Sequence, residues 1–407
     1  MVAKINADVT NGVVITSDTS GELELQANGV TKAKVTANGL QDANGNSLRG
    51  VSFRNLIING DMQIAQRGAS TTGLQYNNDN NYPCCDRWNF HHFGSSSYDA
   101  SFTGSQDTDV PTGQGFASSL KLACTTADAT LEADSAILFR QNIEGQNLQH
   151  LKYGNSSAEN ITLSFWVKSN LTGTFGISAQ HGTTSGFYGA EYTIDTADTW
   201  EKKTITIAGN TADAIDNDNN VGLRLYFYFA LGSNYNGGTN EQWVSNASLD
   251  SIAPNMTNNL GGSTSNYINI TGVQLEVGEG ASDFEFLPYG VQLQRCQRYY
   301  YELNGTATNT PFGMCIANST TQIQSLIPFP VTMRSSPTLS YSSTASNFRA
   351  RIGGSNHDGT ALPNTLLAKP YASYVTQEVA TGMTPGDGGV WRTVDATETF
   401  IAFSAEL

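Results

Sequence analysis

The sequence has little charge, few cysteines and no long apolar run, and each shortage excludes a class of protein. Charged residues make up only 14% of the 407 residues, while Gly, Asn, Ser and Thr are abundant. This composition suits short strands joined by turns and disfavours long helices. No run approaches the ~20 apolar residues of a membrane-spanning helix, so we expect no membrane insertion. Aromatic residues at 10% exclude a disordered chain and predict large cores.

The five cysteines follow no metal-ligand spacing. An odd number without a CxxC pair favours reduced cysteines that serve in packing, made in a cytoplasm, with one disulfide as the alternative. They are Cys84, Cys85, Cys124, Cys296 and Cys315. We also expect no export signal, because no N-terminal stretch is basic and then apolar.

The net charge of −15 disfavours partners that carry phosphate, so we expect no nucleic acid partner and no anionic membrane partner. Its simplest role is solubility. The length predicts two or three domains.

Alternating apolar residues predict a large antiparallel sandwich. Val221, Leu223, Leu225, Phe227, Phe229 and Leu231 share one strand face, with Arg224, Tyr226 and Tyr228 on the other. The same period of two occurs over 161–168 and 175–179. Many such strands without recurrent helices exclude a parallel α/β sheet.

The segment from Asn266 to Glu302 combines a strand, an acidic turn and a predicted short helix. The apolar phase flips at Gly272, between Ile270 and Val273, which predicts a β-bulge. Helical spacing then joins Leu293, Cys296, Tyr300 and Leu303, and Asn304–Gly305 is the predicted helix end. We expect this helix to pack at a domain junction or near a threefold axis.

Ordered short motifs give the chain a resemblance to a known family. They are Asn55-Leu56-Ile57-Ile58-Asn59-Gly60-Asp61-Met62, Gln66-Arg67-Gly68, Asp86-Arg87-Trp88, Leu163-Ser164-Phe165-Trp166-Val167-Lys168-Ser169, Gly272-Val273-Gln274-Leu275-Glu276-Val277-Gly278 and Arg295-Cys296-Gln297-Arg298-Tyr299-Tyr300. Over about residues 55 to 301 this order resembles bacteriophage tail-fibre and related virion fibre proteins with a carbohydrate-binding-like jelly-roll domain. Cys84–Cys85 departs from that pattern.

The expected fold class is all-β with four parts. Residues 1–54 form an N-terminal short-strand segment for virion docking or trimerisation, with a tail lacking fixed structure as the alternative. Residues 55–288 form the large antiparallel jelly-roll β-sandwich, 289–304 the helical junction, and 305–407 a smaller C-terminal β-sandwich tip. Strands in the tip are expected over 323–329, 348–352, 371–379 and 397–403.

Sugar recognition uses exposed aromatic faces together with polar side chains. The candidates in turn-rich contexts are Phe187, Tyr188, Tyr235, Trp243, Tyr371, Tyr374 and Trp391. Trp391 follows Gly386-Asp387-Gly388-Gly389, so we expect it at an exposed loop edge. The tip is the preferred location, since a fibre presents its distal end to the cell.

Other site chemistry is weakly indicated. Asp213, Asp216 and Asp218 lie in one turn-like run and are the only calcium candidates, although a solvated turn is the simpler interpretation because the run does not follow an EF-hand loop. No catalytic constellation emerges, and we expect no enzymatic activity and no other cofactor.

The resemblance implies a structural virion protein, a homotrimeric tail fibre or receptor-binding protein that adsorbs to a host surface glycan. Its partners would be its own copies, virion tail, baseplate or capsid proteins at the N-terminus, and host polysaccharide. A head fibre, decoration or collar protein and a polysaccharide depolymerase are the alternatives.

Overall fold

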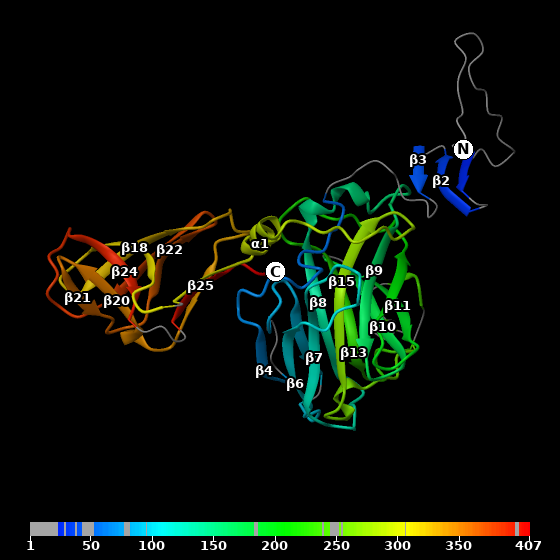
Figure 1. Ribbon diagram of the computed structural model, residues 1–407, viewed down its shortest axis with the longest axis horizontal. Coiled ribbons are helices and arrows are strands. Elements are labelled where there is room, and N and C mark those ends of the chain that lie inside the picture. Colours follow the sequence, from blue (N-terminus) through cyan, green and yellow to red (C-terminus); the bar gives the residue numbers. More distant parts are fainter. Residues whose placement is uncertain are drawn as a thin grey trace, which may run out of the picture.

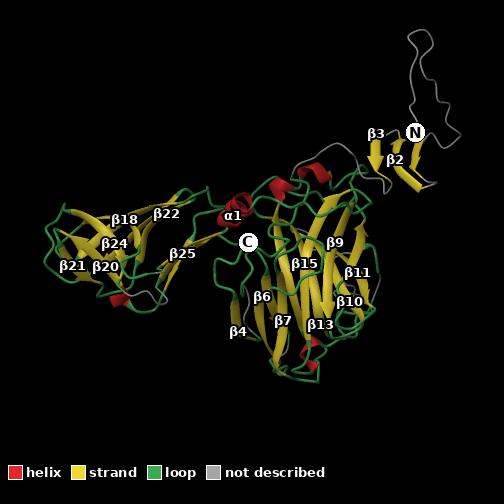
Figure 2. Ribbon diagram, in the orientation of Figure 1, coloured by secondary structure: helices red, strands yellow, loops and turns green. Residues whose placement is uncertain are grey.

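The computed structural model describes residues 23–27, 30–36, 39–42, 53–76, 82–94, 96–182, 186–237, 240–244, 252–253, 255–305, 307–394 and 399–407. These residues form five antiparallel sheets along an elongated chain (Figures 1 and 2). The all-β prediction is therefore confirmed. Within the described ranges, no helix has the length and apolar character needed to cross a membrane.

Two six-stranded sheets pack face to face as a jelly-roll β-sandwich. The first contains, in spatial order, β14 (Trp243–Val244), β11 (Phe187–Ile194), β10 (Gly173–His181), β13 (Val221–Leu231), β8 (Ala136–Glu144) and β5 (Asn89–Phe93). The second contains β12 (Glu201–Ile207), β9 (Ile161–Ser169), β15 (Tyr267–Val277), β7 (Ser119–Thr126), β6 (Ser101–Asp107) and β4 (Ser70–Leu74). Short 3-10 helices are η1 (Gly145–Asn147), η2 (Gln149–Leu151), η4 (Leu260–Gly262) and η5 (Ala345–Asn347).

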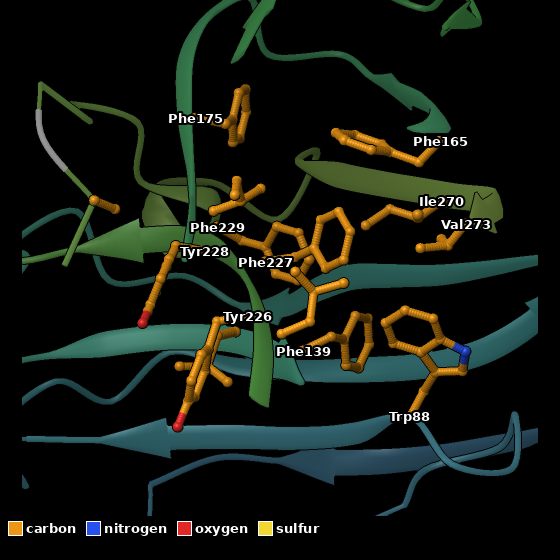
Figure 3. Packing of buried hydrophobic residues seen from close by; sticks show 14 of the residues in the cluster. Trp88, Phe139, Phe165, Phe175, Tyr226, Phe227, Tyr228, Phe229, Ile270 and Val273 are labelled. Carbon is orange, nitrogen blue, oxygen red and sulfur yellow. The ribbon is translucent and has the colours of Figure 1, made fainter. Parts of the chain in front are cut away.

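Aromatic rings from both sheets fill the sandwich core. Phe227 of β13 makes edge-to-face contacts with Trp88 and with Phe165 of β9, at centroid distances of 5.9 and 5.0 Å (Figure 3). Phe139 and Phe229 also meet edge to face. Such aromatic pairs stabilise the fold by more than the burial of their apolar surface alone would. The predicted alternation along β13 thus places its apolar side chains from Leu223 to Leu231 in the core, while Val221 is only partly buried.

Strand β15 contains the predicted bulge. Its register against β9 shifts between Thr271 and Gln274, and Gly272 has a φ of 62°. The bulge returns Val273 and Leu275 to the buried side after Ile268 and Ile270. Val277, the last residue of the alternation, is exposed.

The C-terminal residues form a smaller sandwich of seven and three strands. The larger sheet contains β21 (Ser355–Asp358), β20 (Phe348–Ile352), β24 (Gly388–Thr393), β17 (Pro311–Ala317), β18 (Gln322–Pro328), β23 (Ala372–Glu378) and β22 (Asn364–Lys369). The smaller contains β16 (Tyr300–Asn304), β25 (Phe400–Ser404) and β19 (Thr338–Tyr341). The four predicted tip strands correspond to β18, β20, β23 and β25.

The helix between the two units is shorter than its sequence spacing predicts. Helix α1 spans Tyr289–Gln297, and β16 begins at Tyr300. The helical prediction is wrong for Tyr300 and Leu303, because both lie on β16, which pairs with β25. Asn304 is the last residue of that strand and does not end a helix.

A small three-stranded sheet lies at the N-terminal end of the described chain (Figure 1). Its strands are β1 (Leu23–Ala27), β2 (Val30–Thr36) and β3 (Gly39–Asp42). Leu25, Val30 and Val35 are exposed on it. Most of the 1–54 segment lies outside the described residues, so its expected role in docking or trimerisation stays a prediction.

All five cysteines are free and buried, which confirms that they serve in packing. Burial raises the pKa of the Cys296 thiol, and that of Cys124, above the usual range.

Candidate functional site

The tip candidates do not form one aromatic surface. Tyr371 is 67% exposed, and Tyr374 is partly exposed and donates a hydrogen bond to Oε1 of Gln324 at 3.1 Å. Trp391 is fully buried, contrary to the prediction that it lies at an exposed loop edge. The reason is that Gly388–Thr393 is a strand paired on both sides, so alternation turns Trp391 inward.

Trp391 belongs to the core of the C-terminal sandwich. Its ring packs against Phe312 and Phe348 at centroid distances of 5.2 and 5.9 Å. Its Nε1 donates a 2.7 Å hydrogen bond to Oε1 of Gln377, which is also buried. This tryptophan stabilises the tip and cannot stack on a ligand.

The sandwich candidates pack against one another. Phe187 and Tyr188 are buried, and Trp243 meets Tyr188 and Tyr153 edge to face. Tyr235 meets Phe93 in the same way at 5.6 Å. Because these rings serve as packing partners, the sandwich candidates do not form an open stacking platform.

A pair of stacked tyrosines, Tyr226 and Tyr228, lies on the outer face of the first sandwich sheet. Tyr226 and Tyr228 are stacked at 5.8 Å with an interplanar angle of 10°, and they turn away from the phenylalanine core (Figure 3). Their hydroxyls bond to Oε1 of Gln180 and to Ser178. Both rings are nevertheless buried, and Ala253 and Met256 lie over the neighbouring Gly176. Little of this aromatic face is open to a ligand.

The calcium candidates are not assembled into a site. Asp213 accepts a hydrogen bond from Asn210, and Asp218 accepts two from Asn220. Among the described residues, no group of three or more His, Cys, Asp or Glu could hold a metal ion. Asp213 and Asp218 therefore act as hydrogen-bond acceptors within their turns.

A cleft with a volume of about 1170 Å³ lies between the two β-sandwiches. From the large sandwich it is lined by Arg67, Gly68 and Tyr82. From the C-terminal unit it is lined by Tyr300, Glu302, Asn304, Arg334, Ser335, Ser336, Thr338, Ser340, Tyr341, Ser342, Ser343, Phe400, Ser404, Ala405, Glu406 and Leu407. Sequence reasoning missed this site because it needs residues more than 200 positions apart.

Strand alternation explains why the C-terminal wall of the cleft is polar. In the three-stranded sheet, Tyr301 and Leu303 of β16 pack against the C-terminal core. Their neighbours Tyr300, Glu302 and Asn304 point the other way and line the cleft. In the strand register, Thr338 of β19 lies opposite Ser404 of β25. Ser340 of β19 and Glu302 of β16 lie on either side of Ala402 of β25. One face of this sheet therefore stabilises the tip, while the other offers hydroxyl, amide and carboxyl groups.

Ion pairs and aromatic contacts hold the floor of the cleft in place. Nη2 of Arg67 lies 2.9 Å from Oε1 of Glu406, and its guanidinium stacks 3.5 Å from the centre of the Tyr300 ring. Arg334 donates hydrogen bonds to the carbonyls of Ala405 and Glu406 at 2.8 and 2.9 Å. Such preorganised side chains lose little freedom when a ligand binds.

Glu302 is the carboxyl group with a perturbed pKa in this cleft. Burial raises its pKa above the usual value, against the opposing effect of hydrogen bonds from Tyr300 and Asn304. Ser342 adds a buried Oγ that meets no partner among the described residues. Partly desolvated polar groups of this kind favour a ligand that supplies matching hydroxyls.

The four residues predicted for trimer or junction packing separate in the structure. Cys296 and Tyr299 form a buried cluster with Ile58 and Ile64, against which Leu293 packs. Tyr300 lines the cleft, and Leu303 packs on the C-terminal core. The junction role fits Leu293 and Cys296; a role near a threefold axis stays a prediction.

The outer face of the seven-stranded sheet carries exposed aliphatic side chains on three of its strands. We call Met314 and Ile316 of β17, Leu326 of β18 and Leu367 of β22 the aliphatic stripe. Each is at least 43% exposed, and Met314 reaches 70%. Tyr374 lies between Leu326 and Leu367 in the strand register. Contiguous exposed apolar patches commonly mark association surfaces.

Comparison with known proteins yields distant structural likenesses only: no family model and no curated protein matches the chain. One similar structure is the enzymatically active domain of bacteriophage CBA120 tailspike protein 4, at 16% identity and a TM-score of 0.30. The match covers 55% of this chain but only 22% of the tailspike chain.

Two further similar structures are carbohydrate-binding modules. A CBM4 module matches at 12% identity and a TM-score of 0.27, covering 54% of this chain and 98% of the module. The family 11 module of the Clostridium thermocellum cellulase Lic26A-Cel5E matches at 11% identity and a TM-score of 0.25, covering 52% and 97%. Likenesses at these scores carry no argument about function.

Proposed function

We propose that this chain is a virion fibre protein of a bacteriophage that binds a host surface glycan without cleaving it. The observation that carries the glycan-binding part of the proposal is the polar cleft between the two sandwiches, while the order of the sequence motifs supports the fibre family. Its wall offers hydroxyl, amide and carboxyl groups from Ser340, Asn304 and Glu302, beside the tyrosines at 82 and 300. Its volume of about 1170 Å³ is at or above the upper end of the 300–1,000 Å³ of ordinary ligand sites, enough for an oligosaccharide.

Glycan binding is tested with the full chain on an array of bacterial surface oligosaccharides. We expect Glu302→Gln combined with Asn304→Ala to weaken binding by about tenfold or more, since hydrogen bonds to charged groups contribute about 1.5–3 kcal/mol. Asn364→Ala is the matched control, because Asn364 is exposed on β22, outside the cleft. Equal binding by the double variant and the wild type would contradict the assignment of the cleft.

We further propose that the fibre is a homotrimer docked on the particle through its N-terminal sheet. Exposed apolar residues at both ends of the chain support this: Leu25 and Val35 near the N-terminus, and the aliphatic stripe in the tip. Side-by-side association of copies would cover both regions together, and three linked sites would gain avidity. Light scattering should give three times 43.6 kDa, and a mass of one chain would exclude the trimer.

A polysaccharide depolymerase is the second candidate, favoured by the raised pKa of Glu302 in a cleft that Glu406 also lines. Paired carboxyl groups, one of them protonated, are the usual means of glycoside hydrolysis. Glu406 is engaged in ion pairs with Arg67 and Arg87, so it is a poor nucleophile or base. We expect no release of reducing ends from host polysaccharide, whereas release abolished by Glu302→Gln would establish the enzyme.

A further inference from the structure

Three arginines gather on the outer face of the seven-stranded sheet. Arg349 and Arg351 lie on β20 and Arg392 on β24. Their neighbours Phe348, Ala350 and Trp391 are buried in the core, so strand alternation turns the arginines outward. Arg349 lies directly opposite Arg392 in the register, and Arg351 lies on the adjacent position of the same strand face.

Like charges directly opposite one another destabilise a sheet, so this arrangement needs compensation. Asp358 supplies part of it through an ion pair with Arg349. Arg392 and Arg351 instead converge on one neutral acceptor, Oδ1 of Asn356, at 2.9 and 3.5 Å. Within the described ranges, neither Arg351 nor Arg392 pairs with a carboxylate, and the uncharged amide oxygen does not neutralise their positive charges.

The repulsion between like charges affects the Arg392 side chain most clearly. Its Nε is buried and meets no acceptor among the described residues. Burial, together with the nearby charges of Arg351 and Arg349, lowers the pKa of its guanidinium. An anion bound between the guanidinium groups would reduce their mutual repulsion. It would also accept hydrogen bonds from the N–H groups of each arginine.

The position of the cluster suits a ligand on a cell surface. Strands β20, β21 and β24 form the end of the chain opposite the N-terminal sheet (Figure 1). The cluster is a local concentration of positive charge in a chain whose net charge is −15.

We propose that Arg349, Arg351, Arg392 and Asn356 form a subsite for an oxyanion, a carboxylate or phosphate group carried by a surface polysaccharide. The inference rests on the proposed glycan-binding function and specifies its ligand as an acidic glycan. Arg351 and Arg392 bind the oxyanion, Asn356 positions their guanidinium groups, and Asp358 holds Arg349 at the side of the subsite.

The test uses the full chain and three soluble probes at low ionic strength: an oligogalacturonate, a poly(glycerol phosphate) oligomer and a neutral galactan oligomer. We expect Arg351→Gln with Arg392→Gln to weaken binding of an acidic probe by about tenfold or more, because charge-assisted hydrogen bonds are lost. Binding by the wild type should also weaken as salt is added. The carboxylate and phosphate probes distinguish the two sources of the oxyanion.

Arg224→Gln is the matched control, since it removes one arginine charge from a strand of the large sandwich. The double variant should unfold at the same or a higher temperature than the wild type, because it removes like-charge repulsion. An acidic probe that binds the double variant as tightly as the wild type, or a wild type that does not prefer acidic probes, would overturn the subsite.

The assignment of the cleft and the assignment of the arginine subsite can be overturned independently of each other. Binding that responds to Glu302→Gln with Asn304→Ala but not to the arginine substitutions would retain the cleft and remove the arginine subsite. The opposite pattern would retain the subsite and remove the cleft. Absence of binding to all three probes would overturn the subsite, whatever the glycan array shows.

Discussion

Asp86 illustrates how a single buried carboxyl group influences stability. It lies against Gln66 and Arg67, and burial raises its pKa to about 6 despite the opposing charge of Arg67 and the hydrogen bonds from Gln66. The folded state therefore holds this proton more tightly than the unfolded state, whose value is near 3.8. Ionised Asp86 destabilises the fold above pH 6, and the penalty disappears as the pH falls toward 4.

We expect Asp86→Asn to have a higher free energy of unfolding than the wild type at pH 7, by up to about 3 kcal/mol, since the pKa of Asp86 rises from 3.8 to about 6 and one pKa unit corresponds to about 1.4 kcal/mol. The difference should vanish near pH 4. Urea unfolding at several pH values measures it, and Asp99→Asn, an exposed aspartate, is the control. A stability difference that does not change with pH would contradict the role given to Asp86.

Single residues also show where sequence reasoning stops. The alternation of β13 predicts which of its side chains enter the aromatic core, because the two faces of a strand alternate with a period of two. It does not predict that Tyr226 and Tyr228, on the other face, are also buried. Trp391 is misassigned because Gly386 to Gly389 is typical of a turn, whereas tertiary pairing with β17 and β20 makes Gly388–Thr393 a strand. The Arg87–Glu406 pair joins positions 319 residues apart, and no local pattern could indicate it.

At the scale of elements, the bulge in β15 depends on one glycine. Gly272 has a positive φ, and an added Cβ would lie 2.5 Å from Cζ of Phe116 and 3.1 Å from Cδ1 of Trp166. The sequence predicts this bulge correctly because the phase flip and the glycine coincide.

We expect Gly272→Ala to lower the free energy of unfolding by about 1–3 kcal/mol, from backbone strain and the close contact together. Gly290→Ala in α1 is the control, because a Cβ there meets nothing within 4 Å and alanine favours a helix. Chemical denaturation of both variants measures the effect. Equal stability of the two would show that the bulge tolerates a side chain.

The aliphatic stripe leads us to expect that copies of the chain associate through this surface. Leu326 is 56% exposed at the middle of the stripe. We expect Leu326→Glu to convert the proposed trimer into single chains, because a buried carboxylate without a partner is strongly disfavoured. Light scattering reports the mass, and Lys202→Glu on the exposed surface of β12 is the control. An unchanged oligomer would place the stripe outside the association surface.

At the scale of the whole molecule, the last residues of the chain join the two sandwiches. We call Ala405, Glu406 and Leu407 the C-terminal clasp. The carboxylate of Glu406 pairs with Arg67 and with the buried Arg87, whose guanidinium stacks 3.5 Å from the Tyr299 ring centre. The Leu407 carbonyl accepts a 2.7 Å hydrogen bond from Asn142 of β8.

We expect Glu406→Gln to lower the free energy of unfolding by about 3–5 kcal/mol, the usual result of leaving a buried charge without its partner. Urea denaturation measures the loss. Glu241→Gln, at an exposed glutamate outside the junction, should change stability little. A loss as small as that of the control would show that water replaces the carboxylate at Arg87.

The ion pair between Glu144 and Arg298 at the junction has the opposite dependence on pH from Asp86. Burial would raise the pKa of Glu144, but hydrogen bonds from Arg298 and Tyr299 outweigh it and hold the value below 4.5. This pair therefore stabilises the fold above about pH 4.5 and weakens as the pH falls further. Acid should therefore weaken this contact at the junction between the sandwiches.

The C-terminal clasp also has a consequence for the order of folding. The large sandwich can fold as the chain emerges, but Arg67 and Arg87 receive the carboxylate of Glu406 from a segment more than 300 residues later in the sequence. Glu406 follows β25, whose place is fixed by pairing with β16 and β19. We therefore expect the two sandwiches to dock late in folding, after both have formed their own sheets.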